Sequence, residues 1–256
     1  MNLQPQPELR LLAIELNEWF QSELGRQLLA AEVALLNRFL PTIFGYDLLE
    51  ISGAPQAADL TPDSPIHAKY RLFAAPHNKM GARDFVGDAD GLPFAQNSMD
   101  AVVLHHILDF AQSPHQVLKE ATRVLRPGGQ MLIITFNPMS SWGLYRNIKH
   151  KRRKHIPWRG HFISHRRLQD WFALLELTEL RCRSDFFDVP FAKKRRYGMG
   201  RFIESACEKY FHDCGAFNLL LVRKDVASLT LLPKLKFRKP ILPIRAVKPT
   251  IRERTK

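Results

Sequence analysis

The chain has 256 residues, of which 45% are hydrophobic, and a formal net charge of +13. This length suits one α/β domain with extensions, and the apolar content is sufficient for a packed core. No apolar run approaches about 20 residues, so we expect no membrane-spanning helix. The N-terminus has no signal-peptide pattern, and Cys182, Cys207 and Cys214 lack metal or redox spacing. We therefore expect a cytoplasmic protein.

The positive charge is concentrated in the second half of the chain. Residues 1–128 have a net charge of −5, whereas residues 129–256 have a net charge of +18. Three basic clusters contribute, at 149–155, at 193–196 and in the tail over 226–256. Such localised charge predicts a polyanionic partner or surface.

The first predicted element is a helical region over residues 7–40, which has a continuous apolar stripe. Gly25 interrupts it, which predicts two helices, and Pro41 ends it. We interpret residues 1–42 as an N-terminal helical extension that packs on a sheet. The alternative is a helix lying on a membrane surface, but acids such as Glu15 and Glu32 argue against an anionic membrane.

Seven apolar segments predict strands, and helices alternate with several of them. The strands are expected at residues 46–51, 68–73, 85–86, 101–104, 131–136, 177–186 and 216–223, the last two as an antiparallel pair. A helix is predicted over 113–125, ended by a turn at Arg126-Pro127-Gly128-Gly129, and another after its cap at Ser164. Residues 140–160 are predicted to be a basic, irregular connection, and 226–256 an extended or disordered tail. Alternating strands and helices favour a parallel sheet, whose ligands lie at the carboxyl ends of the strands.

The most specific signal is a set of short motifs in residues 84–138. In chain order these are Gly87-Asp88-Ala89, Leu92-Pro93-Phe94, Ser98-Met99-Asp100, His105-His106, and a run from Leu118 to Gly129 that reads LKEATRVLRPGG. Each motif is weak alone, but together they resemble a class I S-adenosylmethionine (SAM) dependent methyltransferase domain of the methyltransferase type 11 group. With the flanks Trp19-Phe20, Gly25-Arg26, Phe44-Gly45-Tyr46 and Phe136-Asn137-Pro138 included, the chain looks like the YafS-like bacterial group over roughly residues 15–225.

This resemblance implies an α/β architecture, the Rossmann-like class I methyltransferase fold, with a seven-stranded, mostly parallel sheet. The methyltransferase domain would span 43–225, between the N-terminal extension and the basic tail at 226–256. The implied cofactor is S-adenosyl-L-methionine, and the implied reaction is methyl transfer to an undetermined acceptor. Residues 138–160 and 190–200 would shape the acceptor site.

The resemblance also assigns cofactor-binding residues, with two departures from the usual pattern. Glu50, Ser52 and Gly53 occupy the first turn, but Ser52, Ala54 and Gln56 stand where glycines are usual. Residues 69–75 contain no carboxylate for the ribose. A degenerate methyltransferase fold, acting as a nucleic-acid- or partner-binding module, is therefore a second hypothesis. A nicotinamide-dependent oxidoreductase is disfavoured, because the turn is not G-x-G-x-x-G.

The remaining cofactor contacts follow the third and fourth predicted strands. Asp88 and Ala89 would contact the adenine, and Leu104 and His105 would meet the methionine end. His105 either orients an acceptor or accepts its proton, or it shields the cofactor without taking part in chemistry. Because methyl transfer needs mainly alignment and removal of water, the sequence names no catalytic residue.

Two further motifs are interpreted as structural. Asn137-Pro138 resembles the motif of amino-group DNA methyltransferases, but it follows strand five and not strand four, so we expect it to end that strand and begin a helix. His161 and His165 are four residues apart, but with Ser164 as a cap they would not share a helical face, and no acidic third ligand is near. No metal site is predicted.

Three interpretations of the basic half remain open. Its interleaved aromatic residues suit RNA, and its cations equally suit an acidic membrane surface or lipid. A solvated basic surface is the third. The aromatic residues concerned are Trp142, Tyr145, Trp158, Phe162 and Tyr197.

Overall fold

The computed structural model describes residues 9–54, 59–73, 80–148, 155–188 and 214–225. Its helices are α1 (Leu9–Phe20), α2 (Glu23–Phe39), the 3-10 turn η1 (Leu40–Thr42), α3 (Ile107–Phe110), α4 (Pro114–Val124), α5 (Ser141–Ile148) and α6 (His165–Leu174). Its strands are β1 (Asp47–Ser52), β2 (Ala68–Phe73), β3 (Asp84–Val86), β4 (Met99–His105), β5 (Leu125–Phe136), β6 (Leu177–Asp185) and β7 (Phe217–Lys224). The predictions for 149–154, 190–200 and 226–256 lie outside the described residues.

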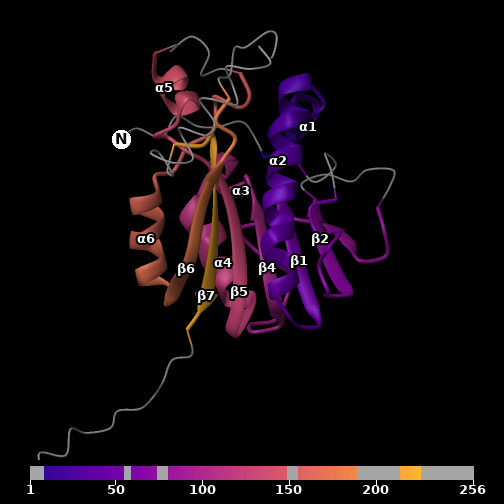
Figure 1. Cartoon of the computed structure of the whole chain (residues 1–256). Helices are drawn as coiled ribbons and strands as arrows, with labels where there is room; N and C mark the ends of the chain where they lie inside the picture. Colours follow the sequence, from indigo (N-terminus) through magenta and orange to yellow (C-terminus); the bar gives the residue numbers. More distant parts are fainter. Residues whose placement is uncertain (1–8, 55–58, 74–79, 149–154, 189–213, 226–256) are drawn as a thin grey trace, which may run out of the picture.

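The strands form one sheet in the order β3-β2-β1-β4-β5-β7-β6. Strands β1 to β5 pair in parallel, and β7 runs antiparallel to both β5 and β6. The carboxyl ends of the parallel strands therefore share one edge, at the top of Figure 1, where α5 follows β5. This confirms the predicted seven-stranded, mostly parallel sheet with its antiparallel pair.

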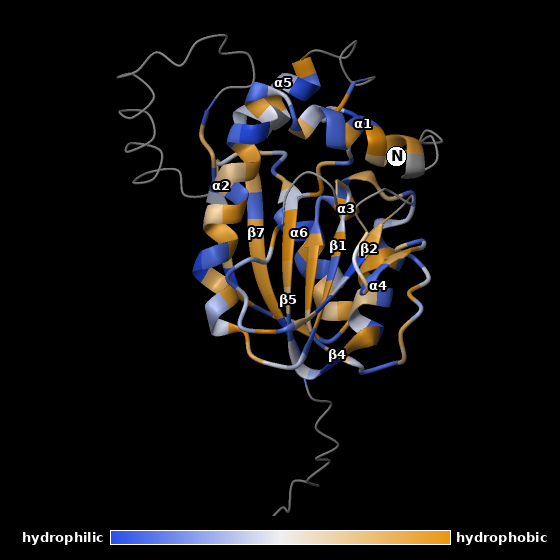
Figure 2. Ribbon diagram, turned by 90° about the vertical axis from the view of Figure 1, so that its right-hand side faces the viewer, coloured by the Kyte–Doolittle hydropathy of each residue, from blue (hydrophilic) through white to orange (hydrophobic). Residues whose placement is uncertain are grey.

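Helices cover both faces of the sheet, so the central strands are apolar on both sides. Figure 2 shows α2 on one face and α3 and α4 on the other. On the α2 side, Leu28 and Leu36 pack in one cluster with Leu48 and Leu219 of the sheet. On the other side, the cluster contains residues of α4 and α6 together with Leu49, Ile133 and other strand residues. The N-terminal helices thus complete the core.

The predicted break in the N-terminal helical region is displaced from Gly25. The chain breaks at Gln21 and Ser22, and the Ser22 side chain caps α2 by accepting a hydrogen bond from the Gly25 amide at 3.1 Å. Gly25 lies in the first turn of α2, where an added Cβ would be 2.3 Å from the Trp19 carbonyl oxygen. The glycine therefore permits close packing between consecutive helices and does not mark the break.

Two other boundary predictions need correction. Residues 140–160 were expected to be irregular, but they contain α5. The stretch from Arg126 to Gly129 was expected to be a turn between a helix and a strand, yet it lies within β5. There the pairing with β4 shifts from Met99↔Leu125 to Ala101↔Gln130, so four residues of β5 bulge out, and Gly128 supplies a φ of 82°. The turn-forming residues therefore produce a bulge inside a longer strand.

The connections from β1 to β2 and from β2 to β3 are unusual for a parallel sheet. Parallel pairs are commonly joined by a helix. The described parts of these connections, 53–54, 59–67 and 80–83, contain no helix. In its place, α1 packs on the turn after β1, where a Cβ on Gly53 would be 3.0 Å from a methyl carbon of Leu16.

Candidate functional site

The ends of β1 and β4 bring together most of the residues predicted to bind the cofactor. Ser52 and His105 are paired in register, and the Gly53 amide donates a 2.8 Å hydrogen bond to the His105 carbonyl oxygen. Leu104 precedes His105 and is fully buried. The first turn and the end of β4 therefore form one connected unit at the carboxyl edge of the sheet.

Asp88 and Ala89 lie apart from this unit, in the loop after β3. Asp88 is exposed and Ala89 is buried. No described residue forms a hydrogen bond or an ion pair with the Asp88 side chain. The carboxylate is thus available to an external ligand, beside a small buried side chain.

Glu50 is buried in the middle of β1 and is poorly paired. Its closest polar contact is a long 3.5 Å hydrogen bond from Thr61 to Oε2, and Oε1 has no partner among the described residues. Burial and the negative charge of Asp59 raise the pKa of Glu50 to about 8, although the charge of Arg71 opposes the rise. Glu50 therefore holds a proton at neutral pH and can donate a hydrogen bond.

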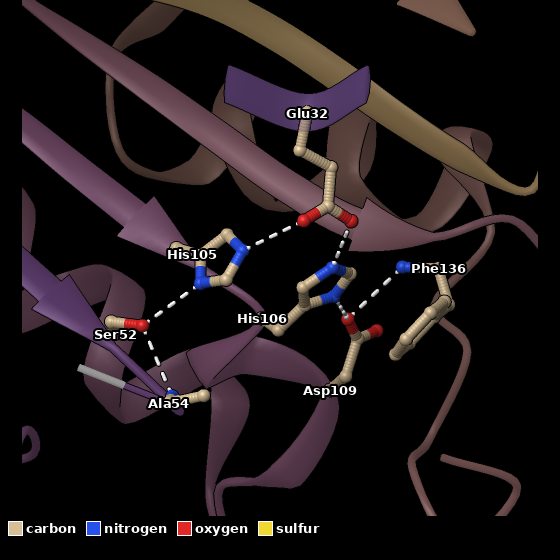
Figure 3. Close-up of polar contacts among 7 residues, drawn as sticks. All are labelled: Glu32, Ser52, Ala54, His105, His106, Asp109 and Phe136. Atoms are coloured by element: carbon tan, nitrogen blue, oxygen red, sulfur yellow. Dashed lines mark hydrogen bonds and ion pairs between the residues drawn. The ribbon is translucent and has the colours of Figure 1, made fainter. Parts of the chain in front are cut away.

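The most tightly built feature of this edge is a buried polar network around Glu32 of α2. Its two carboxylate oxygens contact His105 Nε2 at 2.9 Å and His106 Nε2 at 2.7 Å (Figure 3). The second ring nitrogens are also engaged: His105 Nδ1 lies 2.8 Å from Ser52 Oγ, and His106 Nδ1 lies 2.8 Å from Asp109 Oδ2. The side chains of Glu32, both histidines and Asp109 are completely buried.

Both imidazoles reach Glu32 because the backbone of His106 is left-handed. Successive side chains of a strand point to opposite faces. His106 follows the last residue of β4 and has a φ of 50°, which ends this alternation and begins α3. Its ring then stacks on Phe136, with ring centroids 4.1 Å apart. The two consecutive histidines can therefore share one carboxylate.

One assignment of protons satisfies the hydrogen bonds of both rings. His106 is doubly protonated and donates to Glu32 and Asp109. His105 is neutral: its Nε2–H donates to Glu32, and its Nδ1 accepts from the Ser52 hydroxyl. The Ser52 oxygen in turn accepts from the Ala54 amide at 3.0 Å. Since Nδ1 of His105 is already engaged, the geometry favours the non-chemical interpretation of this residue.

The pKa shifts agree with this assignment. Burial disfavours the charged form of His106, but the charge of Glu32 and the hydrogen bond to Asp109 overcome it and raise its pKa to about 9. Burial would raise the pKa of Glu32, yet His106 and the hydrogen bond from His105 lower it to about 2. Burial lowers the pKa of His105. Glu32 and His106 are thus a buried ion pair.

Sequence reasoning missed Glu32, His106 and Asp109. Glu32 counts in the sequence as one of several acids that disfavour an anionic membrane, but its neighbours three and four residues away are all leucines, which indicates a buried site. These are Leu28, Leu29, Leu35 and Leu36. The spacing of His106 and Asp109, three residues apart at the start of a helix, is also a readable signal. The partnership across more than seventy residues has no local signature.

Metal-ligand patterns occur twice in the described part of the chain. Ligand atoms of Glu32, His105 and His106 lie within 4.8 Å of one another, but each of these atoms already has a hydrogen-bond partner. His165 contacts Glu179, at 2.9 Å, with Cys182 nearby. His161 does not join His165; its Nε2 lies 3.0 Å from the Ala111 carbonyl oxygen.

The aromatic residues expected at an acceptor mouth are mostly inside the protein. Trp142, Trp158 and Phe162 are buried, and Tyr145 is half-buried, whereas Tyr197 lies outside the described residues. Asn137 ends β5 and directs the chain into α5: its Oδ1 accepts from the Met139 amide at 2.9 Å. Its side chain is therefore used in the turn, as expected from the sequence.

The chain is similar to known proteins both in sequence and in fold. Residues 57–133 match a family model described as a methyltransferase domain. A SAM-dependent methyltransferase from Thermotoga maritima, described as a possible histamine N-methyltransferase, superposes with a TM-score of 0.60 at 21% identity, covering 85% of this chain and 98% of that one. A SAM-dependent methyltransferase from Archaeoglobus fulgidus gives a TM-score of 0.56 at 16% identity, over 81% and 97%. Residues 57–133 are therefore similar to a methyltransferase domain, and the described residues have the class I methyltransferase fold.

Among individual relatives, the chain is similar to the uncharacterised protein YafS of Escherichia coli, with 34% identity over 142 residues, which is 56% of this chain and 55% of YafS. It is also 34% identical over 88 residues to the ubiquinone/menaquinone biosynthesis C-methyltransferase UbiE of Roseobacter denitrificans, covering 34% of each protein. The matched part of the chain thus spans about half of YafS and a third of UbiE.

Proposed function

We propose that this protein is an enzyme that transfers a methyl group from SAM to an acceptor, and that it binds SAM at the carboxyl edge of the sheet. The observation that carries the proposal is Asp88, an exposed carboxylate without a described partner after β3, on a sheet with the strand order of class I methyltransferases. The proposed contacts are Glu50, Ser52, Gly53, Asp88, Ala89, Leu104 and His105.

The described residues fit SAM best at its adenine end. The Asp88 carboxylate can accept a hydrogen bond from the adenine amino group, and Ala89 leaves room for the ring. At the first turn, Glu50 carries a buried oxygen with no described partner. Gly53 gives this turn its close backbone approach to Leu16 and to the His106 carbonyl.

Methyl transfer from SAM is compatible with a site in which no residue is assigned as a general base. Bound SAM supplies a methyl group on a sulfonium that is already reactive. The protein's part is to align the acceptor and to exclude water. The buried Glu32–His105 pairing serves this indirectly, because it fixes the end of β4 against α2. The Gly53 amide in turn joins the turn after β1 to the His105 carbonyl oxygen.

We propose that two segments of the chain form the site of the methyl acceptor. Residues 138–148 and 155–160, together with 149–154 and 190–200 outside the described residues, would form its site. Relatives named as ubiquinone/menaquinone biosynthesis C-methyltransferases support a search among lipid-soluble rings. The basic half of the chain supports a polyanionic partner, either RNA or an acidic membrane surface.

The test is calorimetric titration of the full chain with SAM and S-adenosylhomocysteine, after removal of any co-purified ligand. We expect saturable binding that ATP and NAD do not reproduce. Asp88→Ala should weaken it by at least about tenfold, since a hydrogen bond to a charged group contributes about 1.5–3 kcal/mol. Asp90→Ala, at a neighbouring exposed carboxylate, is the matched control and should bind normally.

The second candidate function is a binding module on a degenerate methyltransferase fold. The observation that favours it is the turn after β1, where Ser52 is engaged by His105 and Leu16 packs against Gly53. If the folded chain binds neither SAM nor its demethylated product, this function replaces the enzyme. If it binds both and Asp88→Ala does not differ from Asp90→Ala, the proposed adenine site is wrong.

A further inference from the structure

Helix α5 presents aliphatic side chains to solvent at the carboxyl edge of the sheet. Leu144 and Ile148 are 59% and 65% exposed, and Met139, just before the helix, is 77% exposed. Residues four apart share one face of a helix, so Leu144 and Ile148 form a continuous apolar strip. Exposed apolar side chains on consecutive turns of one helix indicate an interaction surface.

The opposite face of α5 is firmly attached to the protein. Trp142 is completely buried, and its indole N–H donates a 2.8 Å hydrogen bond to the Asp188 carbonyl oxygen. Gly143 packs against the backbone of Pro138, so closely that an added Cβ would be 2.1 Å from its oxygen. Arg146 donates to the Trp158 carbonyl oxygen at 2.9 Å. The apolar strip is therefore held facing outward.

Positive charge accompanies the strip. α5 contains no acidic residue, and the sequence continues from Ile148 into residues 149–154, which read KHKRRK. In the described part of the chain, Arg166 and Arg167 are exposed in the first turn of α6. That turn lies toward the same edge of the sheet, because α6 runs down to the start of β6 (Figure 1). Aliphatic groups bordered by cations match the headgroup boundary of an anionic bilayer.

The described residues favour an anionic membrane over RNA as the partner. Binding of single-stranded RNA needs exposed rings on which bases can stack. Trp142, Trp158 and Phe162 are buried, and the large apolar side chains that are exposed on α1, α5 and the segment before α5 carry no aromatic ring in the part of the chain that the structure describes. The N-terminal helix α1 also exposes Leu11 and Ile14, but Glu15 and Glu18 are exposed beside them and would be repelled by anionic lipid. The observations single out α5.

We propose that this protein docks peripherally on anionic lipid membranes, with the Leu144–Ile148 face of α5 inserted at the level of the headgroups. Such docking places the carboxyl edge of the sheet against the membrane. For the methyltransferase proposed above, docking of this kind lets the methyl acceptor reach the site from the bilayer. The docking itself does not depend on SAM.

The experiment is co-sedimentation of the full chain with vesicles, without SAM. We expect the protein to bind vesicles that contain equal amounts of phosphatidylglycerol and phosphatidylcholine. It should bind vesicles of phosphatidylcholine alone much more weakly. Replacing both Leu144→Ser and Ile148→Ser should lower the partition coefficient for the anionic vesicles at least about tenfold, from the lost apolar burial. The matched control replaces Phe44→Ser and Leu174→Ser, two exposed side chains at the opposite edge, and should bind normally.

Several outcomes overturn the proposal. These are no binding to anionic vesicles, an equal loss in the control variant, or an unchanged partition coefficient in the α5 variant. Tight, salt-sensitive binding of a single-stranded RNA oligonucleotide without vesicle binding would assign the basic surface to RNA. Circular dichroism of both variants shows that each is folded. Because no SAM is present, a lack of vesicle binding does not contradict the proposed methyltransferase activity. Likewise, a lack of SAM binding does not contradict membrane docking.

Discussion

His105 and His106 are neighbours in the chain, and both contact the carboxylate of Glu32 from a helix more than seventy residues earlier. Removing two ionised groups from water is costly unless they are paired and hydrogen-bonded. Here Glu32 receives one hydrogen bond on each oxygen, and His106 donates one from each nitrogen. The pair is therefore tolerated in the core, whereas loss of one partner leaves the charge of the other uncompensated.

Glu32→Gln tests this ion pair. The substitution keeps the shape of the side chain but removes the charge opposite His106. We expect the free energy of unfolding to fall by about 3–5 kcal/mol near pH 6, as when one partner of a buried pair is lost. Chemical denaturation of wild type and variant gives the difference. Glu23→Gln, an exposed position on the same helix, is the control and should change stability by under about 1 kcal/mol.

The pH dependence of that difference has a definite sign. The pKa of His106 rises from 6.5 to about 9 on folding, so its stabilisation is complete below pH 6.5 and is lost as pH rises through about 9. The pKa of Glu32 falls from 4.5 to about 2, so its contribution is complete above pH 4.5 and is lost as pH falls through about 2. The penalty of Glu32→Gln should thus be largest between pH 4.5 and 6.5 and shrink toward pH 9. A penalty that is constant over this range contradicts the pairing.

Single residues differ in how well the sequence predicts them. Asp88 and Ala89 lie in one short motif after a strand, so a local pattern locates them at the carboxyl edge. Glu32 needs knowledge of which helix packs over which strand, because its partners are remote. Ser52 was expected to face the cofactor, whereas its hydroxyl is also tied to His105 and Ala54. Local motifs indicate the edge, and tertiary packing decides the contacts there.

Helices α1 and α2 meet at a junction that only glycine fits. The start of α2 is pressed against the end of α1, so that a Cβ on Gly25 would lie 2.3 Å from Trp19 O and 2.7 Å from Phe20 Cα. Both neighbours are backbone atoms, which cannot turn aside as a flexible side chain can. Removing the overlap requires moving one helix relative to the other.

Gly25→Ala should therefore destabilise the protein. In a helix this change ordinarily stabilises by about 0.5–1 kcal/mol, because alanine has less freedom to lose. Here the overlap should dominate, at a net cost of about 1–3 kcal/mol. Thermal unfolding monitored at the helical band measures it. Gly91→Ala, where an added Cβ meets no atom within 4 Å, should be nearly neutral. A stabilised Gly25→Ala would show that the helices can separate freely.

Whole elements were more predictable than their boundaries. Strands β1, β4 and β7 are mostly apolar and mostly buried, whereas β2 is only partly buried. The predicted positions of all four agree with the structure to within two residues. A helix was expected to begin at Asn137-Pro138, but the basic composition of residues 140–160 predicted an irregular connection where α5 lies. The bulge in β5 also has no periodic signal, since Pro127 and the two glycines after it favour a turn and a bulge alike.

At the scale of the molecule, the N-terminal helices function as part of the core and not as an appendage. The described connections flanking β2 contain no helix, so one face of the sheet depends on α2 for cover. Leu28 and Leu36 are fully buried against this face. Among the described residues, each helix is either too short or too polar to span a bilayer. The division of the chain at residue 42 stays a prediction from the sequence. We propose that residues 9–42 fold together with the sheet.

Shared folding can be tested with two leucines of the N-terminal helices. Leu28→Ala removes a fully buried side chain of α2 and should cost about 2–5 kcal/mol, whereas Leu11→Ala on the exposed side of α1 should change stability by no more than about 0.5 kcal/mol. Denaturant unfolding should be a single transition when followed both by tryptophan fluorescence and by circular dichroism, and Leu28→Ala should shift both signals together. Two separate transitions, with only the first moved by Leu28→Ala, would mean that the helices unfold independently. A single shifted transition would mean that the sheet, the Glu32 network and the carboxyl edge all depend on this helix pair.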